Sequence, residues 1–108
     1  MLKGYTNERL LQIYGGRMCE FGEQEVTAVE VCIEDRGFAD IRLGLTNTFV
    51  PFAVTAKVVT QLMGICGVKY KMADMVGRKL RVLWVDNGLV AVANESEGDY
   101  YLLGDIGK

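Results

Sequence analysis

The chain has 108 residues, of which 50% are hydrophobic and 24% are charged, and it carries a formal net charge of −2 with a pI of about 5.1. This size and composition indicate one globular domain with one core, and the slightly acidic balance disfavours a nucleic-acid binder, which usually shows a basic excess. Histidine is absent from the sequence, which removes the commonest general base and the commonest transition-metal ligand.

Alternating apolar and polar side chains in the first part of the chain predict β-strands. The clearest alternation places Val29, Val31 and Ile33 on one face of a strand. A second alternation places Ile41, Leu43 and Leu45 together. Three strands are therefore expected, at residues 9–14 (RLLQIY), 25–34 and 38–45, with turns at residues 21–24 and 35–37.

The period of the apolar side chains changes after residue 50. Four of them recur at helical spacing, namely Val54, Val58, Leu62 and Ile65. Pro51 suits the first turn of a helix, and Gly64 and Gly67 suit its end. One main helix is predicted at about residues 51–66, and the many β-branched residues leave a strand over residues 52–60 as the alternative.

The second half of the chain predicts a short helical turn and three more strands. Residues 72–77 form the helical turn, closed by Gly77, and residues 78–85 form a strand with apolar side chains on both faces. The Asp86-Asn87-Gly88 turn predicts a type I′ hairpin, because Asn and Gly accept the positive φ that this turn requires. A second turn at residues 95–98 leads into a last strand at residues 99–103.

The predicted order of elements is β-β-β-α-β-β-β. It indicates an α+β fold over residues 1–108, with a curled antiparallel sheet and one main helix on one face. One helix cannot cover six strands, so we expect the sheet to curl into a half-barrel or to bury its second face against another copy. The strand edges also favour a homo-oligomer.

The cysteines and the apolar runs indicate a cellular setting. The three cysteines are Cys19, Cys32 and Cys66; they are widely spaced, and no CxxC motif or export signal occurs. This pattern predicts a reducing, cytoplasmic environment. No apolar run reaches the ~18 residues that a membrane span needs, so no membrane partner is expected.

No catalytic motif is recognisable, and we expect neither an enzyme nor a cofactor. Glu30 and Glu34 share a predicted strand face, and Asp40 lies on the next strand. Three such acids can bind a divalent cation, but a solvated outer face of the sheet accounts for them better. No metal site is therefore predicted, and no glycine loop has the spacing of a phosphate-binding motif.

Two groups of residues are candidates for binding a small anion. The loop at residues 46–48 precedes the predicted helix, and helix N-termini accept phosphates; turn formation and capping are the alternative explanation. The basic residues of the predicted strand at 78–85 lie near aromatic residues, a combination that holds nucleotides by charge and stacking; a cationic edge strand is the alternative. The candidate ligand-binding residues are Thr46, Asn47, Thr48, Arg78, Lys79, Arg81, Trp84 and Tyr100.

The second half of the chain resembles a family of small uncharacterised accessory proteins of bacteriophages and prophages. The resemblance covers about residues 65–103 and depends on the helix end at Gly67, the short turn at residues 72–76, the Gly77-Arg78-Lys79 sequence and the terminal hairpin. It implies a protein that acts by stoichiometric binding, either blocking a host defence protein or sequestering a nucleotide signal.

These observations give a leading functional hypothesis, a non-enzymatic counter-defence protein that binds a small anionic nucleotide in the host cytoplasm. A second hypothesis is a stoichiometric inhibitor of a host defence complex, similar to anti-CRISPR proteins. Its acidic contact surface would consist of Glu30, Glu34, Glu95, Glu97 and Asp99. A third hypothesis is a small structural or assembly protein, and a fourth is an enzyme that uses Glu, Asp, Lys or Tyr.

Overall fold

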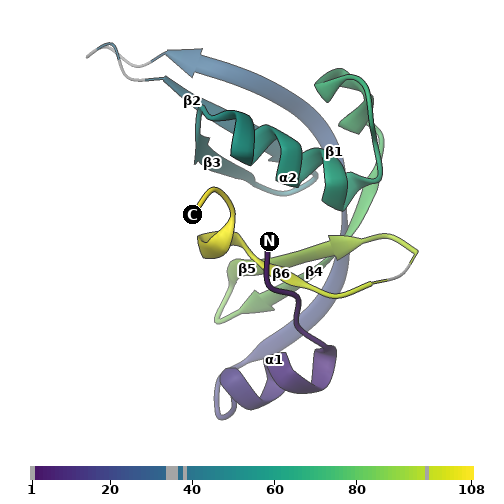
Figure 1. The fold of residues 1–108 in the computed structure, drawn as a ribbon. Coiled ribbons are helices and arrows are strands. Elements are labelled where there is room, and N and C mark those ends of the chain that lie inside the picture. Colours follow the sequence, from purple (N-terminus) through teal and green to yellow (C-terminus); the bar gives the residue numbers. More distant parts are fainter. Residues whose placement is uncertain (1, 34–36, 38, 97) are drawn as a thin grey trace.

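The computed structural model describes residues 2–33, 37, 39–96 and 98–108 (Figure 1). Its helices are α1 (Asn7–Ile13) and α2 (Ala56–Cys66), with short 3-10 helices η1 (Met72–Met75) and η2 (Leu103–Asp105). Its strands are β1 (Cys19–Ile33), β2 (Ala39–Leu45), β3 (Phe49–Ala53), β4 (Lys79–Val85), β5 (Gly88–Asn94) and β6 (Tyr101–Leu102). They form one antiparallel sheet in the order β3-β2-β1-β4-β5-β6. The predicted α+β fold, with a curled sheet and one main helix, is confirmed.

Strand β1 connects the two halves of the sheet. Residues 19–25 pair with β4, whereas the part from Val26 to Ile33 pairs with β2, and the register shifts between Val26 and Ala28. Such a bulge increases the local bend of a strand, and it lies where β1 passes from one partner to the other. The prediction of a turn at residues 21–24 was wrong, since Gly22 lies inside β1 and pairs with Val82 of β4. Continuous pairing with β4 outweighs the weak strand propensity of glycine.

The core has two parts on the two faces of the sheet. Helix α2 packs on one face, where Leu62 is buried with Leu43 and Val82. On the other face Leu10 of α1 is buried with Leu83. Strand β4 is thus covered on both sides, as its mixed sequence pattern predicted, and Figure 1 shows α1 and α2 at opposite ends of the molecule.

Residues 9–14 were expected to form a strand, and this prediction was wrong. The segment belongs to α1, where the hydroxyl of Thr6 accepts a hydrogen bond from the backbone N–H of Arg9 at 3.1 Å. Only Leu10 of this helix is buried. A short apolar run with one buried side chain has no detectable period, so helix and strand cannot be distinguished by pattern alone.

The main helix is shorter than predicted because a strand precedes it. Residues 49–53 form β3, and α2 begins at Ala56, where the Thr55 hydroxyl accepts a hydrogen bond from the N–H of Val58 at 3.1 Å. Pro51 therefore lies in a strand and not in the first turn of a helix. Since β3 is an edge strand, the missing N–H of Pro51 removes no ladder hydrogen bond. The predicted helix end is confirmed by Gly67, which has a φ of 74°.

The β4–β5 turn is of the predicted type I′, with a different alignment. Asp86 and Asn87 have φ values of 50° and 70°, and Gly88 already belongs to β5. The positive φ angles are therefore carried by Asp86 and Asn87, and not by Asn87 and Gly88. The last strand is shorter than expected, and Tyr100, just before it, forms a bridge with Tyr5.

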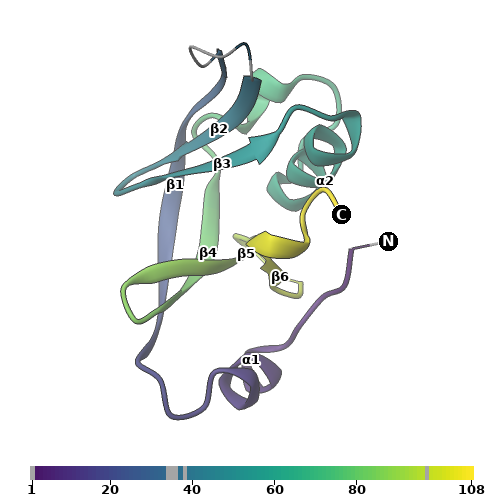
Figure 2. The same ribbon diagram turned by 90° about the vertical axis from the view of Figure 1, so that its left-hand side faces the viewer.

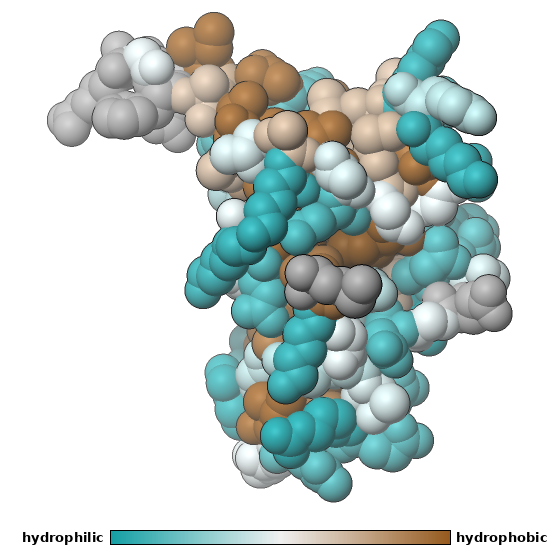
Figure 3. Space-filling view, in the orientation of Figure 1, coloured by the Kyte–Doolittle hydropathy of each residue, from teal (hydrophilic) through white to brown (hydrophobic). Residues whose placement is uncertain are grey.

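The end of β1 extends past α2 and exposes apolar side chains. Val31 is 54% exposed and Ile33 is 79% exposed. Figure 3 shows hydrophobic side chains at the upper left of the molecule, over this end of the β1–β2 pair. The homo-oligomer expected from the sequence stays a prediction. In the described part of the chain, no helix has the length and apolar character needed to cross a membrane.

Candidate functional site

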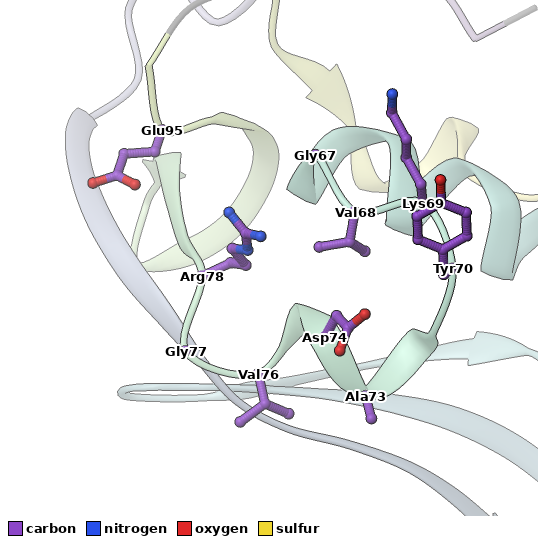
Figure 4. Close-up of a pocket in the computed structure, with 10 residues that line it drawn as sticks. All are labelled: Gly67, Val68, Lys69, Tyr70, Ala73, Asp74, Val76, Gly77, Arg78 and Glu95. Carbon is purple, nitrogen blue, oxygen red and sulfur yellow. The ribbon is translucent and has the colours of Figure 1, made fainter.

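An open hollow of about 810 Å³ lies between the end of α2, η1 and the start of β4. We call it the α2–β4 hollow. Figure 4 shows its lining residues, which are Gly67, Val68, Lys69, Tyr70, Ala73, Asp74, Val76, Gly77, Arg78 and Glu95.

The backbone around the hollow follows from two glycines and a few hydrogen bonds. Gly67 ends α2 in the left-handed conformation, and Gly77, with a φ of 90°, turns the chain into β4. Between them Met75 is fully buried. The N–H of Arg78 donates to the carbonyl oxygen of Met75 at 3.1 Å, and the carbonyl oxygen of Arg78 accepts from Val26 at 2.8 Å. The start of β4 is thus held in place next to the hollow.

Four charged side chains at the hollow have no partner among the described residues. Those of Lys69, Asp74, Arg78 and Glu95 form no hydrogen bond or ion pair with the described part of the chain. Figure 4 shows Arg78 and Asp74 pointing toward the space around Val68, whereas the charged ends of Lys69 and Glu95 point away from it. Cationic groups that are not engaged within a protein are available to a ligand.

An aromatic ring adds a second kind of contact. The side chain of Tyr70 is 89% exposed and lies beside Lys69 at the rim of the hollow. Exposed aromatic rings stack on nucleobases, and Arg and Lys bind phosphate oxygens. The two carboxylates can accept hydrogen bonds from sugar hydroxyls or amino groups. Since the lining contains two cations and two carboxylates and has no net positive charge, the site favours a ligand with few negative charges over a polyphosphate.

Of the predicted ligand-binding residues, only Arg78 lies at this hollow. Lys79 is exposed on β4, with its Nζ atom 3.8 Å from a carboxylate oxygen of Glu23. Arg81 donates from Nε to the carbonyl oxygen of Asn94 and from Nη2 to that of Gly98, both at 2.7 Å. This side chain fixes the loop after β5 and is not available to a phosphate.

Tyr100 cannot serve as the expected stacking surface, because it is only 3% exposed. Its ring packs edge-on against Phe21, with 5.6 Å between the ring centroids. Alternation along β4 places Trp84 on the face opposite Arg81. The predicted cluster of basic and aromatic residues is therefore divided between two faces of the sheet.

The loop at residues 46–48 does not precede a helix, so the reasoning that made it an anion site was wrong. It is the β2–β3 turn, and β3 separates it from α2. The Thr46 hydroxyl accepts a hydrogen bond from the N–H of Glu25, and the N–H of Asn47 donates to Oε1 of Gln24, both at 3.0 Å. The side-chain hydroxyl of Thr48 donates to the carbonyl of the next residue at 3.4 Å. Asn47 and Trp84 line a second, smaller hollow.

The sequence reasoning missed four lining residues, Lys69, Tyr70, Asp74 and Glu95. A signal was present in the Lys69-Tyr70-Lys71 run, where two basic residues flank an aromatic ring directly after the helix end at Gly67. All three side chains of this run are exposed. Such a combination after a helix C-terminus is an indication of a solvent-facing binding segment.

Other candidate groups are dispersed. Glu30 pairs across the strands with Arg42, Glu95 lines the α2–β4 hollow, and Asp99 lies beside Gly4; Glu34 and Glu97 lie outside the described residues. Asp40 lies next to Arg42, with 3.3 Å between Oδ1 and Nε. In the part of the chain that the structure describes, no group of three or more Cys, Asp or Glu side chains could hold a metal ion.

Cys66 lies beneath the hollow and is 4% exposed. Burial raises the pKa of its thiol to about 11, and the nearby charge of Arg78 lowers that pKa in part. The thiol is therefore neutral under physiological conditions and is a poor nucleophile.

Comparison of the chain with protein-family models, with curated proteins and with solved structures finds no match.

Proposed function

We propose that this protein is a non-enzymatic binding protein that sequesters a small anionic nucleotide in the α2–β4 hollow. The observation that carries the proposal is that two unengaged cations, Arg78 and Lys69, line the same hollow as the exposed ring of Tyr70. Arg78 binds the phosphate, Tyr70 stacks on the base, and the carboxylates of Asp74 and Glu95 accept hydrogen bonds from the sugar or the base.

The charge balance of the hollow defines the ligand further. The two carboxylates in the lining repel a triphosphate more strongly than a ligand with one or two negative charges. Cyclic nucleotides and ADP-ribose-type molecules meet this condition. Sequestering such a signal in the host cytoplasm is the role implied by the resemblance to phage accessory proteins, and it requires no catalytic group.

The first experiment is native mass spectrometry of gently purified protein, followed by calorimetric titration with a cyclic mononucleotide, ADP-ribose and ATP. We expect stoichiometric binding of the first two, weaker binding of ATP, and an unchanged ligand mass after incubation. Arg78→Ala should weaken binding by about 10- to 100-fold, the range for loss of a hydrogen bond to a charged group.

Lys79→Ala is the matched control, because it removes a cation of the same strand that lies near Glu23 and outside the hollow. This variant should bind as the original protein does. Equal affinities of the Arg78→Ala and original proteins would refute the site, and a chemically altered nucleotide would refute the non-enzymatic role.

A further inference from the structure

A second hollow, of about 290 Å³, is lined by Glu20, Asn47, Trp84 and Asn87. It lies between the β2–β3 turn and the β4–β5 turn, and we call it the inter-turn hollow. Figure 2 shows the two turns projecting to the same side of the molecule, with β1 running between them. Its volume is at the lower end of the range for small-molecule sites.

One wall of the inter-turn hollow is fixed to β1, and the other is fixed to Met18, the residue just before β1. On one side, the backbone N–H of Asn47 donates to Oε1 of Gln24, whose side chain is 6% exposed and therefore held in one place. On the other side, the N–H of Asp86 donates to the carbonyl oxygen of Met18 at 2.9 Å, and Oδ1 of Asp86 accepts from the N–H of Met18 at 3.1 Å. The width of the hollow is thus set before any ligand enters, which lowers the entropic cost of binding.

The second wall has an additional ionic contact. Nε of Arg17 donates to Oδ2 of Asp86 at 2.7 Å. This hydrogen bond is the main reason why the pKa of Asp86 is lower than its ordinary value, with the N–H of Met18 contributing. Asp86 thus holds the turn as a carboxylate and leaves the amide of its neighbour Asn87 unengaged.

The groups that face the inter-turn hollow are unengaged. The side chains of Glu20, Asn47, Trp84 and Asn87 form no hydrogen bond or ion pair with the described residues. Gly22 lies beside the indole, and a Cβ atom at that position would be 3.9 Å from Nε1 of Trp84. That distance is an ordinary van der Waals contact, so β1 passes directly beside the indole at Gly22.

We propose that the inter-turn hollow binds a nucleobase that carries an exocyclic amino group. The half-buried ring of Trp84 stacks on the base, the amides of Asn47 and Asn87 pair with its edge, and the carboxylate of Glu20 accepts a hydrogen bond from the amino group. Among the residues that the structure describes, no Lys or Arg lines this hollow, so the site binds the base and not the phosphate. The proposal is independent of the α2–β4 hollow, which is next to the opposite end of β4.

The test uses the fluorescence of Trp84, which is the only tryptophan in the chain. Adenosine, cytidine and uridine are titrated separately, because nucleosides lack the phosphate that the α2–β4 hollow requires. We expect saturable quenching by adenosine and cytidine, and about 10-fold weaker binding of uridine, since uracil has no exocyclic amino group to donate to Glu20.

Three variants make the outcome specific. Asn47→Ala should weaken adenosine binding about 10-fold, and Glu20→Gln should remove the preference over uridine, because an amide can also donate. Glu23→Gln, at an exposed position of the same strand outside the hollow, should change neither value. Absence of saturable quenching, or equal binding of uridine and adenosine by the original protein, would overturn the proposal.

Discussion

The guanidinium carbon of Arg81 lies 5.0 Å from the centroid of the Tyr100 ring. The same side chain donates two hydrogen bonds of 2.7 Å to backbone carbonyl oxygens in the loop after β5. It therefore joins β4, the loop and the second core cluster, to which Tyr100 belongs. The neighbouring basic residue Arg78 has no comparable contacts, although the two residues are close in sequence.

This difference predicts unequal effects of two similar variants on the free energy of unfolding. Arg81→Ala should lower the free energy of unfolding by roughly 2–3 kcal/mol, because two charge-assisted hydrogen bonds and a ring contact are lost. Arg78→Ala should change it by less than about 0.5 kcal/mol, the usual effect at an exposed position. Urea denaturation measures both values. A loss for Arg78→Ala as large as for Arg81→Ala would mean that Arg78 has a structural role.

Helix α1 should depend on a single buried side chain. It has seven residues, and an isolated helix of this length is unstable in water. Leu10→Ala should lower the free energy of unfolding by about 2–5 kcal/mol, since Leu10 is fully buried against Leu83 and its neighbours. The matched control is Leu11→Ala, at a position that is 47% exposed, and its effect should stay within about 0.5 kcal/mol. Equal losses in denaturant titrations would contradict this account.

Two glycines at the end of α2 should respond oppositely to alanine. Gly64 lies inside the helix with open space at its Cβ position, so Gly64→Ala should raise the free energy of unfolding by roughly 0.5–1 kcal/mol. Gly67 has a φ of 74°, and a Cβ atom there would lie 3.3 Å from Nδ2 of Asn94. Gly67→Ala should therefore lower the free energy of unfolding by about 1–2 kcal/mol. Thermal and urea denaturation measure the change in stability of each variant. Changes of the same sign would mean that the helix does not end at Gly67.

The buried thiol of Cys66 predicts a specific alkaline instability. Its pKa is about 11 in the fold and 9.0 without burial, so the unfolded chain ionises first as the pH rises. The contribution of the neutral thiol to stability is complete below pH 9 and is lost between pH 9 and 11, at no more than about 1.4 kcal/mol per pH unit.

Comparison with the Cys66→Ala variant isolates the contribution of the Cys66 thiol to stability, because the other titrating groups are the same in both proteins. The difference in unfolding free energy between the two should decrease over that interval and stay constant below it. In native protein near neutral pH, thiol reagents should label the half-buried Cys19 and Cys32 before Cys66. Equal labelling rates would contradict the burial of Cys66.

Much of the fold could be predicted from the sequence, because the local signals agree with the tertiary contacts. The alternation in the middle of β1 and in β2, the end of α2 at Gly67 and the turn at Asp86 and Asn87 were read correctly in type. The errors occurred where a segment contributes few buried side chains. In α1 a single leucine is buried, and β3 is a five-residue edge strand whose Pro51 resembles a helix start.

The candidate site was predicted only in part. The side-chain period of two along β4 already implies that Arg81 and Trp84 point to opposite faces, so their separation could have been anticipated. The α2–β4 hollow could not be anticipated from the sequence, because it depends on the path of the chain after Gly67 and on the distance between Arg78 and Tyr70. Spacing in sequence does not determine either of these.

The division of β1 between two partners has a consequence for how the protein folds. Strands β1, β2 and β3 are consecutive, so they can pair locally and can form early while the chain is being synthesised. Pairing of β1 with β4 joins residues half the chain length or more apart, as in Glu25 with Lys79 and Cys19 with Val85. Such non-local pairing is slow, since a long loop must close first. We therefore expect the arrival of β4 to determine the rate of folding, and until then the first half of β1 is an unpaired edge that another nascent chain can capture.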